Sequence, residues 1–578
     1  MARTISPKPH RNALLRYFPI LEWLPKYNRA WFAGDIVAGL SVWALMVPQA
    51  LGYATISGVP VQYGLYAAMI ALLVYPIFTT SRHVITGPSS TIAAVTGAAV
   101  MTMAAANSTE VVQLVAVITV FAGLLYIALA LLKMGWISNF LSESVLTGFI
   151  FGIGIDVVIG QLGKLTGSPE SGDTAWQKLL SWLQGLPELN APTAVLGVSL
   201  LALLIVLKLF APKVPGALVA VVLGIGGALV LPLAEMGVVL TGDVPSGLPS
   251  FALPSFSLLA ENAVVLVPAA VGVLLIGFAE SLAAARQYAA KYHYDIDVDQ
   301  EMLAQGMANT VSGLFQGINV DGSLSKSSLN DASGAKSQLS SLAQGAFVVL
   351  TLLFLAPLFA NLPKAALAAI VIQAVAFGLW KIPQMRRLWR VSHSDFAFAL
   401  AALLGVMTFG TLQGVFIGVL LSLLWLVWRA SHPELQVLGR TADGRGYLRV
   451  DQHPGVVTLP GLLIVRLDGP LFFATANPVR NRLRTLILEA RPAVKCVIFD
   501  MEGSNLVDLQ GADELHELVE ELNALGVELY IARVKAIVRQ ELERYGALLA
   551  IGPARIYPDV DSAVAAAGGN TTASSGVA

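Results

Sequence analysis

Apolar segments long enough to cross a lipid bilayer recur from about residue 34 to residue 430 of this chain. A helix needs roughly 20 such residues to span the hydrocarbon core. Composition agrees, because 56% of the 578 residues are hydrophobic and 13% are charged, against about 25% charged in an ordinary soluble domain. We therefore expect a polytopic α-helical membrane protein.

The apolar segments differ in how uniform they are. The clear ones cover 34–57, 62–79, 110–133, 137–160, 192–209, 215–233, 262–285, 338–360, 394–410 and 411–430. Less uniform ones lie at 88–104, 299–316, 323–335 and 363–380. Together they predict about fourteen transmembrane segments.

The distribution of basic residues predicts the orientation, because short cytoplasmic loops collect Lys and Arg. Alternate loops carry basic residues such as Arg82, Lys208 and Lys336, whereas segment 232–262 has three acids and neither Lys nor Arg. An exception is 163–191, where two lysines are offset by acids. We expect a multi-pass protein of the plasma or inner membrane, with both ends of the membrane region in the cytoplasm.

The composition changes after Arg429, where charges become frequent. Three strand-like stretches, "GLLIVRLDGPLFFATA", "VKCVIFDMEG" and "VELYIARV", alternate there with helical ones. This alternation predicts a small α/β domain. The expected organisation is a cytoplasmic N-terminal segment at 1–30 rather than a signal peptide, a transport domain at 31–432, the α/β domain at 433–567 and a disordered tail at 568–578.

Several functional classes are excluded by what the sequence contains. A net charge of −1, from 36 basic and 37 acidic residues, gives no reason to expect a nucleic-acid partner. Cys496 is the only cysteine, which excludes an internal disulfide and favours a small buried apolar role. No P-loop, paired catalytic carboxylates or His cluster is present, so we expect neither an ATP-driven pump nor an enzyme, and no metal or cofactor.

The "DIDVDQE" stretch at 295–301 resembles the beginning of a calcium-binding loop. Gln300 stands at its sixth position and Gly306 at its twelfth, where an EF-hand requires Gly and Glu. The calcium interpretation is therefore rejected.

An internal repeat relates the two halves of the membrane region. "HVITGPSS" at 83–90 and "INVDGSLSKSS" at 318–328 both run from β-branched residues through Gly into hydroxyls. Gly87 and Gly322 are 235 positions apart, and Gln49 and Glu280, on the preceding segments, are 231 apart. Matching interrupted segments in two halves indicate the binding site of a secondary transporter.

Each interrupted segment is expected to end in a helix start at membrane depth, whose free N–H groups and dipole favour an anion. Non-helical backbone is tolerated there only when it is buried or lines a cavity. Lys326 would add a full positive charge. The predicted binding hydroxyls are those of Ser89, Ser90, Thr91, Ser323, Ser325 and Ser327. Two structural alternatives stay open, namely helix packing for the small residues and a Lys326 that snorkels to the interface.

Glu280 lies well inside the segment that begins near Asn262. A carboxylate at that depth is costly unless it is paired, protonated or hydrated. We interpret it as the proton-coupling residue, with a structural ion pair to Lys326 as the alternative. Gln49 alone is a weak indicator, because a hydrogen bond between helices explains it equally well.

Four motifs, in order, resemble the SulP (SLC26) anion transporters. They are "GDIVAGLSVWALMVPQALGYATISGVP", "SRHVITGPSS", "AESLAAARQYAAKYHYDIDVDQEMLAQGMAN" and "GSLSKSSLNDASGAK". "LIVRLDGPLFFATA" and "VIFDMEG" are similar to the STAS domain that these transporters carry. The resemblance spans residues 17 to 566. It implies a seven-plus-seven inverted repeat with UraA-like core and gate domains, a homodimer, and a cytosolic STAS domain that could take a cytosolic partner.

The resemblance implies an anion-binding site between the third and tenth membrane segments, to which the first and eighth segments also contribute residues. It carries over to Gln49, Tyr53, Ser89, Ser90, Glu280, Ser323, Ser325 and Lys326. Relatives usually have Arg at the Lys326 position, and Lys lacks the planar fork that grips an oxyanion. Sodium-coupled members place a hydroxyl one turn after the acid, where this chain has Ala284, so protons are favoured over sodium.

The STAS-like domain departs from one regulatory pattern. Bacterial regulators with this domain have a phosphorylatable Ser or Thr where "VDLQGAD" has Leu509. We expect that switch to be absent and Asp508 to cap the following helix.

The sequence thus predicts a secondary active transporter that takes up an inorganic anion with protons by alternating access. Sulfate is the first substrate predicted, and bicarbonate and four-carbon dicarboxylates are the alternatives. An anion channel and a sensor that signals through the STAS domain are alternatives of a different class. An acid beside a channel pore would repel anions, and a sensor would be expected to lose Lys326 or Glu280.

Overall fold

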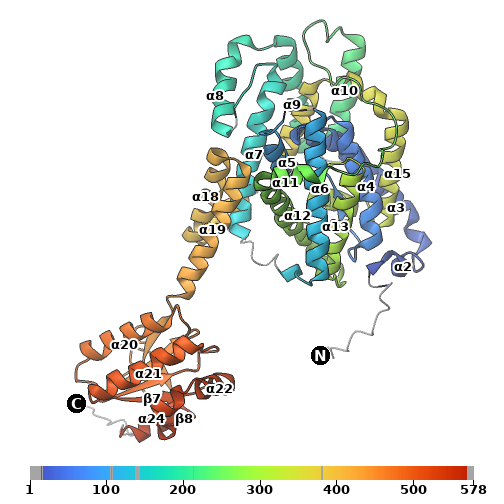
Figure 1. Ribbon diagram of the computed structural model, residues 1–578. Helices are drawn as coiled ribbons and strands as arrows, with labels where there is room; N and C mark the ends of the chain where they lie inside the picture. The colour runs from blue at the N-terminus through green and yellow to red at the C-terminus, as the bar shows by residue number, and fades with distance from the viewer. Residues whose placement is uncertain are drawn as a thin grey trace. The chain divides into compact units, whose positions relative to one another are not determined.

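The computed structural model describes residues 15 and 17–568, apart from 105, 107, 137–142, 173, 212–213, 379, 381 and 445. Most of the expected N-terminal segment and the expected disordered tail beyond Gly568 lie outside the described residues. The chain divides into two units, Met1–Ser422 and Leu423–Ala578, which are described separately (Figure 1).

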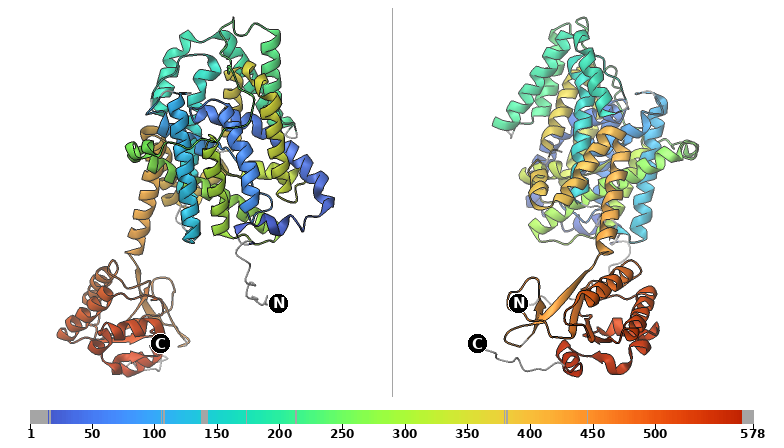
Figure 2. Two further views of the ribbon diagram at one scale, coloured as in Figure 1. Left: turned by 45° about the vertical axis from the view of Figure 1, so that its right-hand side comes forward. Right: turned by 90° about the vertical axis from the view of Figure 1, so that its left-hand side faces the viewer.

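The first unit is a bundle of helices that falls into two consecutive sets of seven. The first set is α3 (Phe32–Ile56), α4 (Gln62–Phe78), α5 (Ser90–Val100), α6 (Thr109–Leu131), α7 (Glu143–Thr166), α9 (Ala191–Phe210) and α10 (Gly216–Val230). The second is α12 (Ala263–Tyr292), α13 (Val298–Leu314), α14 (Leu324–Ala332), α15 (Leu339–Leu350), α16 (Lys364–Gly378), α18 (His393–Phe409) and α19 (Thr411–Ala430), the last of which runs into the second unit. Figure 2 shows the bundle from two further sides.

Every predicted membrane segment coincides with one of these helices. Among the described residues, seven helical stretches are long and apolar enough to cross a membrane, and several shorter apolar helices accompany them. Short helices connect the bundle, namely α2 (Ile20–Trp23), α8 (Ala175–Gly185), α11 (Phe256–Glu261) and α17 (Ile382–Val391). The helical membrane fold expected from hydropathy is therefore confirmed.

Two short strands interrupt the helical pattern where the repeated motifs lie. β1 (Ile85–Gly87) and β2 (Asp321–Ser323) pair antiparallel, with Thr86 opposite Gly322 and Gly87 opposite Asp321. α5 follows β1 after two residues and α14 follows β2 directly. The pairing satisfies backbone groups that the bilayer could not, and it brings the two helix starts to opposite ends of one small ribbon.

α13 holds this ribbon with buried amide side chains. Gln305 Nε2 donates to Thr86 Oγ1 at 3.0 Å. Asn309 makes two hydrogen bonds to the backbone of Val320. Its Nδ2 donates to the Val320 carbonyl at 2.8 Å, and its Oδ1 accepts from the Val320 amide at 3.0 Å. Because these side chains replace the hydrogen bonds that water would make, α13 carries polar residues inside a membrane bundle.

Close helix packing brings α13 against α6. A Cβ built on Gly123 would lie 2.4 Å from the Thr310 amide nitrogen, and one on Gly313 would lie 2.9 Å from that of Val120. Only glycine permits backbones to approach so closely. α6 packs against both α12 and α13, which are labelled beside it in Figure 1, and α12 also contacts β2.

The second unit contains a six-stranded sheet in the order β4-β3-β5-β6-β7-β8. Its strands are β3 (Glu434–Arg440), β4 (Tyr447–Arg449), β5 (Leu462–Asp468), β6 (Cys496–Asp500), β7 (Glu528–Ala532) and β8 (Ile556–Tyr557). Its helices are α20 (Ala476–Glu489), α21 (Leu509–Ala524), α22 (Ala536–Arg544), α23 (Ala547–Ile551) and α24 (Val560–Ala566). β5 to β8 run parallel, whereas β3 and β4 pair antiparallel at one side.

Two sequence predictions about this unit are confirmed. The Asp508 carboxylate accepts from the Gly511 amide at 2.7 Å and caps α21, as expected. Cys496 is 3% exposed on the central strand β6, with its side chain in an apolar cluster. Burial, followed by the nearby Glu528 carboxylate, raises the pKa of the Cys496 thiol to about 12.

Candidate substrate-binding site

The hydroxyl groups predicted to bind an anion lie at the two helix starts. Ser89 is the extended residue before α5, and Ser90 and Thr91 begin that helix. Ser323 caps α14, its hydroxyl accepting from the Lys326 amide at 3.4 Å, and it also lies 3.1 Å from the Ser325 hydroxyl. The pairing of β1 with β2 therefore brings both predicted groups of hydroxyls into one region.

The Lys326 side chain is buried between the two halves of the chain. It is 1% exposed, and its ammonium donates to the backbone carbonyl of Pro88, just before α5. The same ammonium lies 5.7 Å from the centre of the Tyr53 ring, a cation–π distance. This geometry is inconsistent with a lysine that snorkels to the membrane surface.

A second buried acid, Asp321, belongs to this cluster and was not among the predicted site residues. Its side chain is fully buried, and Oδ2 accepts from the Ser89 hydroxyl at 2.8 Å. Within the described part of the chain, Oδ1 is buried without a hydrogen-bond donor. The acid was visible in "DGSLSK", but the strand register that turns it toward Ser89 came only from the structure.

Glu280 projects from α12 toward the start of α5. It is half-buried, and its Oε1 accepts from the Thr91 hydroxyl at 3.1 Å. The Glu280 and Asp321 carboxyl groups are both near enough to interact electrostatically with Lys326. The structure thus places two acids, rather than one, around the single lysine.

α3 contributes the residues implied for the first segment. Gln49 and Tyr53 lie one helical turn apart and are both buried. The Gln49 carbonyl oxygen is buried with no donor among the described residues, so a helix-to-helix bond to this atom does not account for it. Tyr53 interacts with Ser90 as well as with Lys326. Tyr53 therefore faces the cluster, and Gln49 lies one turn before it on the same helix.

Two of the predicted serines differ in their surroundings. The Ser327 hydroxyl accepts from the Ile85 amide at 3.0 Å and donates to the Ser323 carbonyl at 2.7 Å, so it joins α14 to β1. Ser325, by contrast, is exposed at the start of α14. We assign Ser327 the role of positioning α14, whereas the Ser325 hydroxyl is accessible to a ligand.

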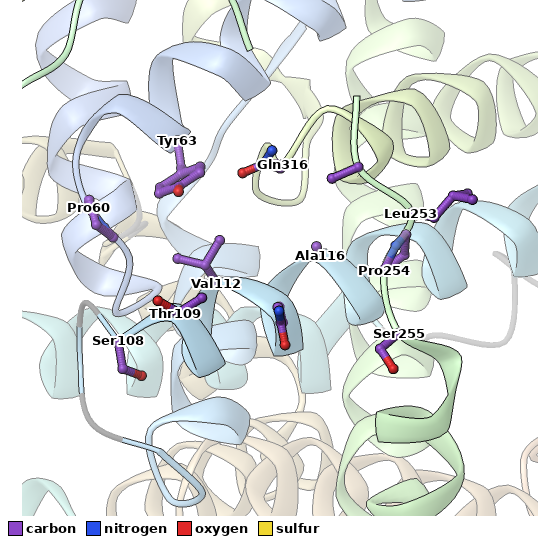
Figure 3. Close-up of a pocket in the computed structure, with 12 residues that line it drawn as sticks. Pro60, Tyr63, Ser108, Thr109, Val112, Ala116, Leu253, Pro254, Ser255 and Gln316 are labelled. Carbon is purple, nitrogen blue, oxygen red and sulfur yellow. The ribbon is translucent and has the colours of Figure 1, made fainter. Parts of the chain in front are cut away.

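A cavity of about 280 Å³ lies elsewhere, between the beginnings of α4 and α6. Figure 3 shows Tyr63, Val112, Leu253 and Gln316 around it. Its described lining includes none of the predicted site residues. We therefore keep the candidate site at the lysine cluster.

Comparison with known proteins decides the family. Residues 32–402 match the family described as "Sulfate permease family", and residues 447–563 match the one described as "STAS domain". The chain belongs to the sulfate permease family. A probable sulfate transporter of Mycobacterium tuberculosis (strain CDC 1551 / Oshkosh) is 34% identical over 94% of this chain and 96% of its own length. The chloroplastic sulfate transporter 4.1 of Arabidopsis thaliana is 30% identical over 95% and 82%.

Solved structures show the same fold. The murine anion transporter Slc26a9, in an inward-facing state, superimposes with a TM-score of 0.88 at 23% identity, over 98% of this chain and 97% of that one. The transmembrane domain of the cyanobacterial bicarbonate transporter BicA gives 0.59 at 24% identity, over 69% and 98%. The protein is therefore a multi-pass membrane protein with the SLC26 fold and a C-terminal STAS domain.

Proposed function

We propose that this protein is a secondary active transporter that takes up sulfate together with protons by alternating access. The observation that carries the proposal is the buried Lys326 ammonium, which extends from α14 to the backbone carbonyl of Pro88, just before the start of α5. A charge buried in a membrane bundle is costly and indicates function. The sulfate transporters among the relatives support sulfate as the first substrate.

The proposed anion site uses both helix starts and the lysine. Free N–H groups at the start of α5 and the hydroxyls of Ser90 and Ser325 would contact the anion. The Lys326 ammonium would offset part of its charge, as a compact donor rather than a planar fork. Gln49, whose side-chain carbonyl oxygen meets no donor in the described part of the chain, and Tyr53 would close the site from α3.

Proton coupling is assigned to Glu280. Its carboxylate is half-buried at membrane depth and contacts Thr91 at the start of α5. One turn later on α12 stands Ala284, which is fully buried and has no side-chain oxygen. A sodium ion prefers several oxygen ligands, so the absence of a hydroxyl at position 284 favours the proton as the coupling ion.

The remaining assignments concern the assembly. We propose a homodimer in the plasma or inner membrane, with the N-terminal segment and the STAS domain in the cytoplasm. The exposed apolar side chains of α19, such as Phe416 and Leu424, suit contact with lipid. Bicarbonate and four-carbon dicarboxylates are the competing substrates, and a channel or a sensor would use the same fold.

Uptake into proteoliposomes tests this function. Labelled sulfate, bicarbonate and succinate are offered in turn, under an imposed proton gradient or an imposed sodium gradient. We expect the proton gradient to drive sulfate accumulation. Accumulation driven by sodium alone would contradict the coupling, and accumulation of bicarbonate or succinate without sulfate would replace the substrate.

Variants connect the assay to the site. Glu280→Gln should lose proton-driven accumulation and retain exchange of labelled for unlabelled sulfate. The matched control is Glu110→Gln, on the first turn of α6, which should accumulate sulfate like the parent. If Glu280→Gln still accumulates sulfate against its gradient, the acid is only structural.

A further inference from the structure

Asp321 is a buried acid that the proposed function does not yet use. It is fully buried in β2, beside the one lysine of the site. When Lys326, Glu280 and Asp321 are all ionised, two negative groups outnumber one positive group. A site with net negative charge would repel the anion that it is proposed to bind.

The groups facing Asp321 come from four helices and from the linker before α5. Lys326 on α14 is the positive one, and the Glu280 carboxyl on α12 interacts with Asp321 through a side-chain hydrogen bond, which requires a proton on one of the two acids. Tyr53 on α3 and Tyr126 on α6 are near enough to interact with the Asp321 charge, and Ser89 before α5 donates a hydrogen bond to it. Tyr126 is directed away, because its hydroxyl donates to the Leu274 carbonyl at 2.8 Å. Among the described residues that face the two acids, Lys326 is thus the one positive group, and Asp321 and Glu280 share it.

The hydrogen bonding of Asp321 distinguishes its two oxygens. Oδ2 accepts from Ser89, whereas Oδ1 is buried without a donor among the described residues. A buried carboxylate oxygen without a donor carries a full desolvation penalty, which a proton on that atom removes. Once protonated, Oδ1 becomes an O–H donor, and a donor in this position suits a neighbouring oxyanion.

We propose that Asp321 carries a second coupling proton, so that Asp321 and Glu280 are both protonated when the anion is bound. This inference rests on the proposed function. Each carboxylate takes one proton from the outer solution and releases it to the cytoplasm with the anion. With both acids neutral, Lys326 leaves the empty site positive, and two protons offset the two charges of sulfate.

The experiment measures protons moved per sulfate in proteoliposomes, with the membrane potential clamped and an enclosed pH indicator. We expect about two protons per sulfate for the parent and about one for Asp321→Asn, with the slope of log KM against pH reduced by about one. The matched control is Asp156→Asn, on α7, where the acid pairs with Lys178 on α8. It should keep the parental stoichiometry.

A second variant keeps the test decisive if Asp321→Asn does not fold. Ser89→Ala removes the hydrogen bond that favours the ionised carboxylate, so the pH dependence of KM should shift toward higher pH. Three results would overturn the inference and leave sulfate–proton transport intact. They are an unchanged pH dependence of KM in Ser89→Ala, one proton per sulfate in the parent, and an unchanged number of protons per sulfate in Asp321→Asn. A parent that moves sulfate without protons would instead contradict the proposed function.

Discussion

The ammonium of Lys326 on α14 donates a hydrogen bond to the backbone carbonyl of Pro88, which precedes α5. The two residues are 238 positions apart and belong to different halves of the repeat. The charged group of the site is thus held by backbone from the other half, so the site forms only when the two interrupted segments meet.

Lys326→Ala is predicted to raise the KM for sulfate by at least about 30-fold, because removing one partner of a buried charged interaction costs about 2 kcal/mol or more. Initial rates of labelled sulfate uptake measure this. Lys208→Ala, an exposed lysine in the last turn of α9, is the control and should match the parent. An unchanged KM in Lys326→Ala would place the anion elsewhere.

Lys326→Arg is predicted to retain uptake and to alter selectivity. The planar guanidinium binds an oxyanion through two parallel hydrogen bonds, but it needs more room near Gly87, where a built Cβ would lie 3.8 Å from the Lys326 ammonium. The ratio of sulfate to bicarbonate uptake should change in this variant. Equal ratios in parent and variant would show that the side chain at 326 does not select the substrate.

Hydropathy located the membrane helices because each must present about 20 apolar residues to lipid, and the strands β5, β6 and β7 were found because they are buried runs between helical patterns. The edge strands β4 and β8 were missed, and so was β3, which lies between β4 and β5. β4 and β8 are short, and β3 mixes charged with apolar residues, so burial imposes little pattern on their sequences.

At the site, motif and repeat predicted Lys326 and the hydroxyls, because an anion requires donors at helix starts. Asp321 was not predicted, since its role depends on the antiparallel register that sets Gly87 opposite it. The sequence predicted that Ser327 binds the anion, but it could not show that the Ser327 hydroxyl also joins α14 to β1. A sequence pattern shows which residues are polar, but only the packing shows which of them already have partners.

Gly322→Ala is predicted to impair transport by disturbing the pairing of β1 with β2. A Cβ at this position would lie 2.9 Å from Val84 Cγ1 and 3.0 Å from the Cα of Ser281, a backbone atom on α12 that cannot move aside cheaply. Gly226→Ala on α10 is the control, because a Cβ there would meet nothing within 4 Å. Sulfate uptake per folded protein should fall at least about tenfold only in Gly322→Ala. Equal uptake in both would contradict the tight register.

Glu301→Gln is predicted to destabilise the first unit. The Glu301 side chain, 2% exposed on α13, accepts from Tyr75 at 2.6 Å, from the hydroxyl of Thr79 and from the amides of Thr80 and Ser81. All of these groups donate, so the amide nitrogen of Gln would face donors. The free energy of unfolding should fall by about 1–3 kcal/mol.

Thermal unfolding of the purified protein in detergent measures this effect. Glu261→Gln is the control, because Glu261 is exposed at the end of α11. Its melting temperature should equal that of the parent. A melting temperature of Glu301→Gln that also equals the parental value would show that the hydrogen bonds to Glu301 are replaceable.

Cys496 is predicted to resist alkylation in the folded STAS domain. Burial raises the pKa of its thiol from 9.0 to about 12, so at pH 8 the folded protein contains on the order of a thousandfold less thiolate than the unfolded chain. The folded thiol keeps its proton where the unfolded thiol loses it. The stabilisation that comes from burying the protonated thiol is therefore present below pH 9 and is lost as the pH rises toward 12.

Since the chain has no other cysteine, N-ethylmaleimide labelling measured by mass spectrometry reports this site alone. Labelling should be slow in the native protein and fast in denaturant, and equal rates in both would contradict the burial of the thiol.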